Sequence, residues 1–73
     1  MTKLPSVSGK KCIKALQKAG FSVKRQEGSH VTLRRNEPFT QIVVPLHDEL
    51  DRGTLRSIIR LSGLSVDQFS SLL

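Results

Sequence analysis

Between residues 21 and 44 the sequence alternates between apolar and polar side chains, and two short turn signals interrupt the alternation. A period of two residues is typical of β-strands, because successive side chains point to opposite faces of a sheet. The predicted strands are residues 21–24, 30–35 and 40–44, with turn signals at 28–29 and 36–38. Consecutive strands joined by turns this tight pair antiparallel. The pattern therefore predicts a three-stranded antiparallel meander.

The segment before the strands has the apolar periodicity of an α-helix. Its apolar positions recur at three- and four-residue steps and form one stripe, Cys12, Ile13, Leu16 and Ala19. Ser8 is suited to cap a helix beginning near Gly9, and Gly20 is suited to end it in the left-handed conformation. Residues 1–7, which include a proline, are expected to form an extended arm.

Two more helices are expected after the strands. Asp51 or Thr54 can cap the first of them and Gly63 can end it. The Ser65-x-x-Gln68 spacing is a capping-box pattern and begins a short last helix, with Phe69 in its apolar stripe. The order is α-β-β-β-α-α, an α+β fold. The apolar stripes of the helices must cover one face of the sheet, because a sheet this small is not stable alone.

Length and composition limit what the chain can be. Its 73 residues fit one small domain, residues 1–73, without room for a large cofactor cleft. No apolar run approaches a membrane span, and no signal-peptide core is present, so no membrane partner is expected. A single cysteine excludes an internal disulfide framework and indicates a cytoplasmic protein. Cys12 lies on the buried helical stripe, where it is expected to act as a small apolar residue.

The positive charge is concentrated in the first half of the chain. Residues 1–36 hold nine basic groups and one acid, a net +8, whereas residues 37–73 hold three basic groups and five acids, a net −2. A one-sided basic surface indicates a polyanionic partner, with nucleic acid the leading candidate, although lysines can also simply keep a small protein in solution. The candidate RNA-binding side chains are Lys10, Lys11, Lys14, Lys18, Lys24, Arg25, Arg34 and Arg35.

His30 is the candidate catalytic residue. It follows Gly28-Ser29, begins a predicted strand, and projects with Thr32 and Arg34 from the uncovered face of the sheet. Imidazole exchanges protons near neutral pH and could take the proton from a ribose 2′-OH, so that the oxygen attacks the adjacent phosphorus and leaves a cyclic phosphate. This chemistry needs no metal and would spare DNA, which lacks the 2′-OH. The alternative from geometry alone is an exposed strand histidine without a role.

His47 could supply a second acid or base that protonates the leaving oxygen. The alternative is a loop histidine hydrogen-bonded to a neighbour such as Asp48. The sequence has no zinc-binding Cys/His cluster and no phosphate-binding glycine-rich loop, so no metal and no cofactor are expected.

Several short motifs together resemble the HicA family of toxins from bacterial toxin–antitoxin pairs. The resemblance spans residues 4–70, and its fragments are Leu4-Pro5, Ser8-Gly9-Lys10, Ala19-Gly20-Phe21, Gly28-Ser29-His30, Val44-Pro45-x-His47, residues 53–58 and residues 62–65 with Phe69. The resemblance implies a double-stranded-RNA-binding-domain-like fold. It also implies mRNA cleavage, growth arrest, and neutralisation by a HicB-type antitoxin.

The resemblance also assigns roles to individual residues. The family's catalytic histidine lies in its Gly-Ser-His motif, which corresponds to His30; Gly28 would serve the turn, and Ser29 would orient the imidazole or the phosphate. Family members often carry an aromatic residue just after this histidine, whereas this chain has Val31. We therefore expect RNA binding through phosphate contacts rather than base stacking next to His30.

Three functions remain in competition at the level of sequence. The first is an endoribonuclease toxin that uses His30. The second is a non-catalytic RNA-binding module that uses the same basic surface. The third is a protein-interaction domain whose basic face docks an acidic partner. Cleavage of RNA by the isolated chain separates the first from the other two.

Overall fold

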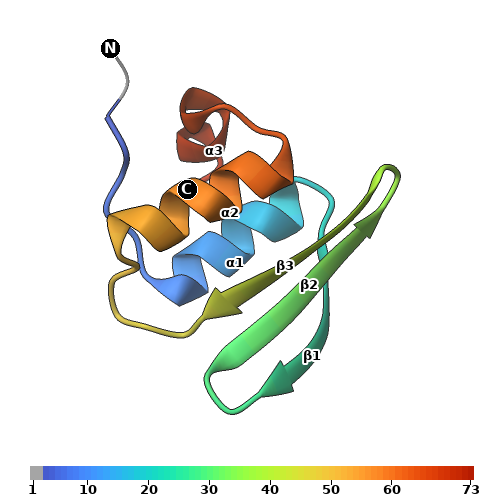
Figure 1. Ribbon diagram of the computed structural model, residues 1–73. Helices are drawn as coiled ribbons and strands as arrows, with labels where there is room; N and C mark the ends of the chain where they lie inside the picture. Colours follow the sequence, from blue (N-terminus) through green and yellow to red (C-terminus); the bar gives the residue numbers. More distant parts are fainter. Residues whose placement is uncertain (1–2) are drawn as a thin grey trace.

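The computed structural model describes residues 3–73, so the first two residues of the predicted arm lie outside the described part. Three helices and three strands follow one another in the predicted order (Figure 1). They are α1 (Gly9–Lys18), β1 (Ser22–Glu27), β2 (His30–Asn36), β3 (Phe39–Pro45), α2 (Arg52–Ser62) and α3 (Val66–Ser71). The α+β class and the double-stranded-RNA-binding-domain-like arrangement are therefore confirmed.

The helix termini form as the local sequence predicts. The Ser8 side chain accepts a hydrogen bond from the Lys11 backbone N–H at the start of α1, and Asp51 does the same for Thr54 in α2. Gly63 ends α2 with a φ of 80°, a conformation that glycine adopts without strain. Both hydrogen bonds of the Ser65–Gln68 capping box are present at α3.

The strands form an antiparallel sheet in the order β1-β2-β3, which confirms the meander. The register pairs His30 with Pro45, Thr32 with Val43 and Arg34 with Gln41. Paired residues share a face of the sheet, so these three pairs lie on one face. Val31, Leu33, Ile42 and Val44 lie on the other face, where they are buried.

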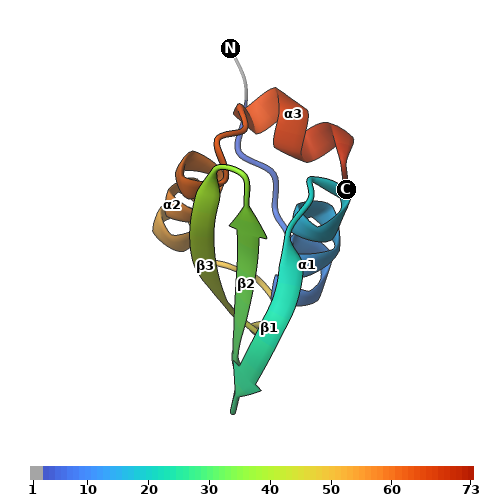
Figure 2. The ribbon, with the colours of Figure 1, turned by 90° about the vertical axis from the view of Figure 1, so that its right-hand side faces the viewer.

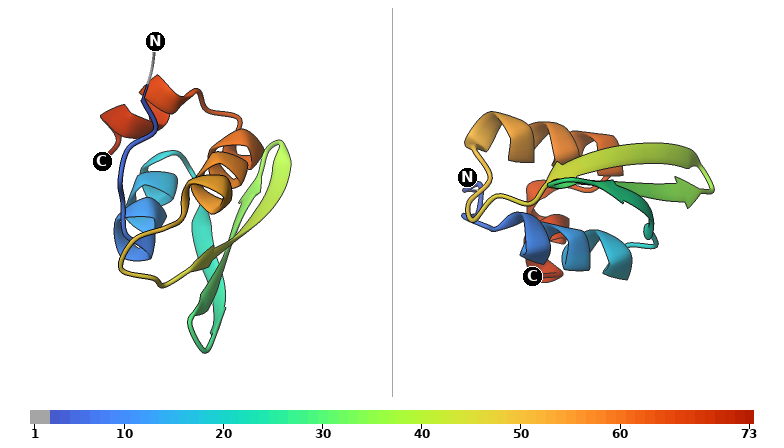
Figure 3. Two further views of the ribbon diagram at one scale, coloured as in Figure 1. Left: turned by 60° about the vertical axis from the view of Figure 1, so that its left-hand side comes forward. Right: turned by 90° about the horizontal axis from the view of Figure 1, so that it is seen from below.

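The helices pack against that second face and leave the first one uncovered. Figure 2 looks onto the uncovered face, with the three strands in front of α1 and α2. The left-hand view of Figure 3 shows α1 and α2 to the left of the β2–β3 hairpin, and residues of both helices share one core with Leu33 and Ile42. Figure 2 shows α3 across one end of the molecule. We call the uncovered side the open face.

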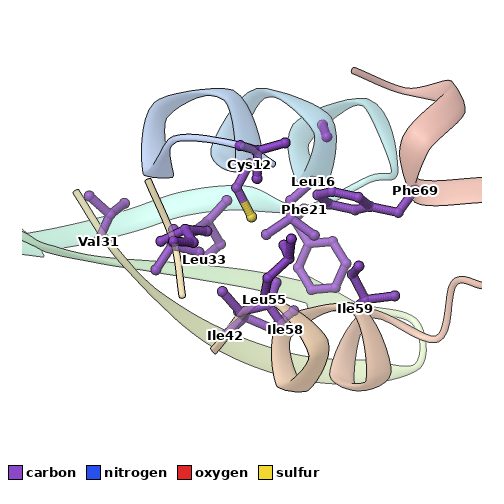
Figure 4. Packing of buried hydrophobic residues seen from close by; sticks show 14 residues of the cluster. Cys12, Leu16, Phe21, Val31, Leu33, Ile42, Leu55, Ile58, Ile59 and Phe69 are labelled. Atoms are coloured by element: carbon purple, nitrogen blue, oxygen red, sulfur yellow. The ribbon is translucent and has the colours of Figure 1, made fainter. Parts of the chain in front are cut away.

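One hydrophobic core lies between the sheet and the helices. Cys12 and Leu16 of α1, Leu33 of β2, Leu55 of α2 and Phe69 of α3 meet there and are essentially inaccessible to water (Figure 4). The six-residue α3 is thus attached to the fold by the fully buried Phe69 ring, and Val66 packs against the same core. Leu72 also packs against the core, whereas Leu73 is exposed.

Two strand residues differ in exposure from what a simple alternation of faces predicts. Val23 faces the helices opposite Leu33, yet 44% of its surface is exposed, because β1 is an edge strand and every one of its residues is exposed. Thr32 lies on the open face as predicted but is only 8% exposed, because longer polar side chains surround it. The strands are also longer than the alternation indicated, and β3 includes both Phe39 and Pro45.

Candidate active site on the open face of the sheet

His30 is the first residue of β2 and follows the two-residue turn Gly28–Ser29. Gly28 has a φ of 59°, and no other atom would crowd a side chain there, so the turn requires glycine for its backbone conformation alone. The turn lies at the end of the sheet away from α3 (Figure 1). His30 is exposed, and Glu27 and Pro45 are its cross-strand neighbours.

The loop that contains His47 is fixed beside this turn by backbone hydrogen bonds. The Leu46 N–H donates to the Ser29 carbonyl oxygen at 2.6 Å, and the Gly9 N–H donates to the His47 carbonyl oxygen at 2.9 Å. A Cβ atom on Gly9 would collide with the Pro45 carbonyl oxygen, so α1 begins in direct backbone contact with the end of β3. His47 itself is exposed. The structure therefore joins the two histidine-bearing segments and the start of α1 into one local unit.

A hollow of about 350 Å³ lies on the open face, on the same strand as His30. Its lining consists of Lys24, Arg25, Thr32, Arg34 and Gln41, so three cations, a hydroxyl and an amide surround it and no acid does. Thr32 is two residues from His30 along β2, a step of about 6.6 Å. The hollow has the charge and the hydrogen-bond donors that a phosphate group requires.

A bulge in β1 gives this hollow two adjacent cations from one strand. The pairing between β1 and β2 shifts between Val23 and Arg25, so that Arg25 pairs with Thr32. A β-bulge interrupts the strict alternation of faces, and both Lys24 and Arg25 line the hollow as a result. Arg25 Nε also lies 3.7 Å from the Glu27 carboxylate, an exposed contact that contributes little to stability.

Two adjacent arginines of β2 have different environments. Arg34 lies on the open face, where its guanidinium donates twice to Gln41 Oε1, at 3.3 and 3.1 Å. Arg35 turns to the helix side: it donates to the carbonyl oxygens of Ser62 and Pro38, and its guanidinium stacks 4.7 Å from the centre of the Phe21 ring. The structure thus places Arg35 in the fold, away from the open face.

The four lysines of α1 lie on a different surface from the hollow. Lys10, Lys11, Lys14 and Lys18 are exposed, whereas Cys12, Ala15 and Leu16 of the same helix face the sheet. Three of these lysines border a groove that Val7, Leu72 and Leu73 complete, and Lys18 Nζ donates to the Leu72 carbonyl oxygen at 3.0 Å. We call these four residues the lysine ridge. The predicted RNA-binding set is therefore divided between two surfaces.

Phe39 and Gln41 complete the open face, and neither was predicted from the sequence pattern as part of the site. Phe39 is 67% exposed at the end of the sheet opposite His30, and the Arg34 guanidinium lies 5.7 Å from the centre of its ring. The alternation along β3 could have placed Gln41 on the open face, because Ile42 and Val44 are buried on the opposite face. The face on which Phe39 lies could be known only from the pairing of β2 with β3. Phe39 lies next to a turn, and the alternation of side chains does not determine how long that turn is.

Cys12 takes no part in this site. It is fully buried, and desolvation raises the pKa of its thiol to about 12, so the thiol is neutral at physiological pH. No group of three or more His, Cys, Asp or Glu side chains among residues 3–73 could hold a metal ion. In the same part of the chain no helix is long and apolar enough to cross a membrane.

The site can be compared with known families. The model of the HicA toxin family of bacterial toxin–antitoxin systems matches residues 9–64, which include α1, the whole sheet, the His30 turn and α2. The chain belongs to the HicA family. No curated protein matches it closely enough to add to this assignment. As a HicA-family toxin, the chain is expected to have a cognate antitoxin. The matched region holds every element that positions His30 and the hollow.

Proposed function

We propose that this HicA-family toxin is an endoribonuclease that cleaves mRNA with His30 as general base. The observation that carries the proposal is the position of His30: it is exposed at the start of β2, on the face and strand that carry the cationic hollow. The family's Gly-Ser-His motif supports the same residue. An alternative function, RNA binding without cleavage, would use the same hollow.

The proposed reaction is an internal transesterification. The imidazole of His30 accepts the proton of a ribose 2′-OH, and the 2′-oxygen attacks the adjacent phosphorus. The bond from phosphorus to the 5′-oxygen breaks, and that oxygen takes up a proton, which leaves a 2′,3′-cyclic phosphate and a free 5′-OH. The positive field of the cations that line the adjacent hollow favours the negative charge that develops on the phosphoryl oxygens. We propose that Gly28 shapes the turn and that Ser29 helps to position the imidazole or the phosphate. His47 is the candidate for the second proton transfer.

The decisive experiment compares His30→Ala with wild type in two assays. Expression in a bacterial host reports growth arrest, and incubation of the purified chain with RNA reports cleavage. We expect His30→Ala to lose both, by at least about 100-fold in rate, since general-base catalysis contributes on that scale. Its melting temperature should match that of wild type, because His30 is exposed. Equal cleavage by the two proteins would refute the proposal.

Controls separate the cleavage mechanism from its alternatives. His47→Ala tests the second proton-transfer group and should slow cleavage without abolishing binding. Addition of EDTA should leave cleavage unchanged, and a substrate with 2′-deoxyribose at the cleaved step should stay intact. RNA that binds in a salt-dependent manner but is recovered whole from wild type would favour the non-catalytic module.

We further propose that the cognate antitoxin is of the HicB type and that both proteins act in the cytoplasm. Such a partner would neutralise the toxin by covering His30 or by bringing carboxylates to the lysine ridge. A HicB-like reading frame next to this gene, whose product co-purifies with the chain and stops cleavage, is the expected finding. A neighbouring product that binds without affecting cleavage would contradict it.

A further inference from the structure

The open face carries an ordered series of side chains along β2 and β3. His30 lies at one end, the hollow around Thr32 follows, and Arg34 with Phe39 lies at the other end. The pairing register places all of them on one side of the sheet, and Figure 2 shows β1, β2 and β3 side by side on this side with no helix in front. We call this series the open-face track.

The hollow is organised before any ligand arrives. Arg34 is held by two hydrogen bonds to Gln41, so its guanidinium loses little freedom when it binds an anion. Lys24 and Arg25 approach from β1, on the other side of Thr32. A phosphodiester in the hollow would therefore meet donors from two strands. Because Thr32 is one two-residue step from His30, this phosphate would be a neighbour of the cleaved phosphate and not the cleaved phosphate itself.

Phe39 adds an apolar surface to the cationic track. Its ring is largely exposed, and the Arg34 guanidinium lies 5.7 Å from the centre of the ring. A large exposed aromatic ring next to an arginine is the arrangement on which unpaired bases stack. Phe39 lies at the end of the sheet opposite His30, so it would stack on a base that is distant from the cleaved bond.

The length of the track fits a short single strand. From His30 to Asn36, the partner of Phe39, six residue steps of β2 span about 20 Å. An extended chain of about three nucleotides covers this distance. Duplex RNA offers no unpaired base to stack on Phe39, because its bases are enclosed within the helix. The track therefore selects unpaired RNA.

We infer that the open face binds single-stranded RNA along β2, with a backbone phosphate in the hollow and a base against Phe39. This inference deepens the proposed ribonuclease function and rests on it. An acidic protein segment could use the same cations, but stacking on Phe39 and the continuity with His30 favour RNA. Cleavage should accordingly need substrate that extends beyond the two nucleotides at the cleaved bond.

Binding measurements with an uncleavable probe test the inference. The probe is a fluorescein-labelled RNA octamer with 2′-O-methyl riboses, whose Kd is measured by anisotropy at several salt concentrations. We expect Lys24→Gln and Arg34→Gln each to weaken binding and to lower the slope of log K against log salt by about 0.7, the value for one phosphate contact on a single strand. Phe39→Ala should weaken binding about five-fold or more and leave the slope unchanged.

Matched controls lie on the helix layer. Arg56→Gln removes the same charge as Arg34→Gln from the exposed side of α2, and Leu61→Ala removes an exposed apolar side chain from the same helix. Neither should change Kd or slope appreciably. Melting temperatures establish that each variant is folded. If Arg34→Gln is unstable, Lys24→Gln at an exposed position still tests the contribution of a single positive charge.

Several outcomes would overturn the inference. They are equal effects of open-face and control variants, no binding by wild type at low salt, tighter binding of a duplex of equal length, and displacement of the probe by an acidic peptide but not by RNA. The ribonuclease proposal fails independently of these. Intact binding with normal cleavage by His30→Ala would reject the proposed base and keep the track, whereas His30-dependent cleavage with no effect of Lys24, Arg34 or Phe39 would reject the track alone.

Discussion

Neighbouring residues of the same type can have opposite roles because a strand sends them to opposite faces. Arg34 and Arg35 are adjacent in β2, yet one guanidinium borders the hollow on the open face and the other donates to the carbonyl oxygen of Ser62 at the end of α2. Charge alone made both candidates for RNA binding. The two arginines differ in role because successive side chains of a strand point to opposite faces, and the helices cover only one of these faces.

The arginine pair gives a direct prediction. Arg35→Gln should lower the free energy of unfolding by about 1–3 kcal/mol, because it removes charged hydrogen bonds and the stacking on Phe21. Arg34→Gln should change it by less than about 0.5 kcal/mol, as is usual for surface residues. Urea denaturation of both variants measures this. Similar stability losses for the two would contradict the separate roles.

Cys12 illustrates how burial controls reactivity. In the unfolded chain its thiol ionises near its ordinary pKa of 9.0, whereas in the fold the pKa is raised to about 12 by desolvation. The unfolded state therefore loses its thiol proton first, and the free energy of unfolding falls as the pH rises from about 9 to about 12. Below pH 9 both states keep the proton, and the thiol contributes no pH dependence.

The same burial predicts slow chemical modification. At pH 8 a disulfide reagent such as DTNB should react with Cys12 only at the rate at which the chain opens, because the folded thiol is neutral and inaccessible. Urea at its unfolding midpoint should accelerate the reaction sharply. Rapid labelling of the native chain in the absence of urea would show that this part of the core is open.

At the scale of elements, the site depends on how α1 meets the end of the sheet. Gly9 lies against the Pro45 carbonyl oxygen and donates its N–H to the His47 carbonyl oxygen. The next backbone bond, from Leu46 to Ser29, reaches the turn that presents His30. One close helix–strand contact therefore sets the position of the turn that carries His30.

Gly9→Ala tests this contact. The added methyl group would occupy the position of the Pro45 carbonyl oxygen, so α1 must move, and we expect a stability loss of about 1–3 kcal/mol, as for other overpacked sites. Because the movement reaches the His30 turn, cleavage should fall even in the folded fraction. Gly53→Ala is the control. The added Cβ would lie 3.4 Å from the Asp51 side chain, an ordinary contact, so this substitution should be tolerated. Full stability and activity of Gly9→Ala would contradict the proposed coupling.

At the scale of the whole molecule, the formal charge of +6 acts on two surfaces. The open-face track begins at His30 and includes the cationic hollow, whereas the lysine ridge lies on the outer side of α1. Long-range attraction does not require contact, so the ridge can raise the rate of RNA association even where RNA does not touch it. We therefore propose a steering role for the ridge in RNA binding.

Charge reversal in the ridge tests steering against contact. Lys11→Glu with Lys14→Glu lowers the formal charge by four and leaves Lys18, which bonds to Leu72, in place. We expect slower RNA association at low salt, convergence with wild type at high salt, and an unchanged kcat, measured by stopped-flow binding and steady-state cleavage. A defect that persists at high salt would instead indicate direct RNA contact.

Local sequence determined the elements, because helix caps, glycine stops and the periods of two and 3.6 residues depend on neighbours a few positions apart. Ser8, Gly63 and the Ser65–Gln68 box are each where the sequence placed them. The side of β2 on which His30 lies also followed from alternation. The sequence did not determine how far apart these helix ends and the His30 side chain lie in the folded chain.

Only the tertiary structure divided the cations into an open-face track, a lysine ridge and the fold contact of Arg35. That division depends on the β1 bulge, on the register that brings Phe39 and Gln41 to Arg34, and on the face that the helices cover. These are long-range pairings, and the free energies that select them are shared among many residues of the core. Charge counted along the chain cannot contain this information, because a single residue of register or one bulge moves a side chain to the opposite face.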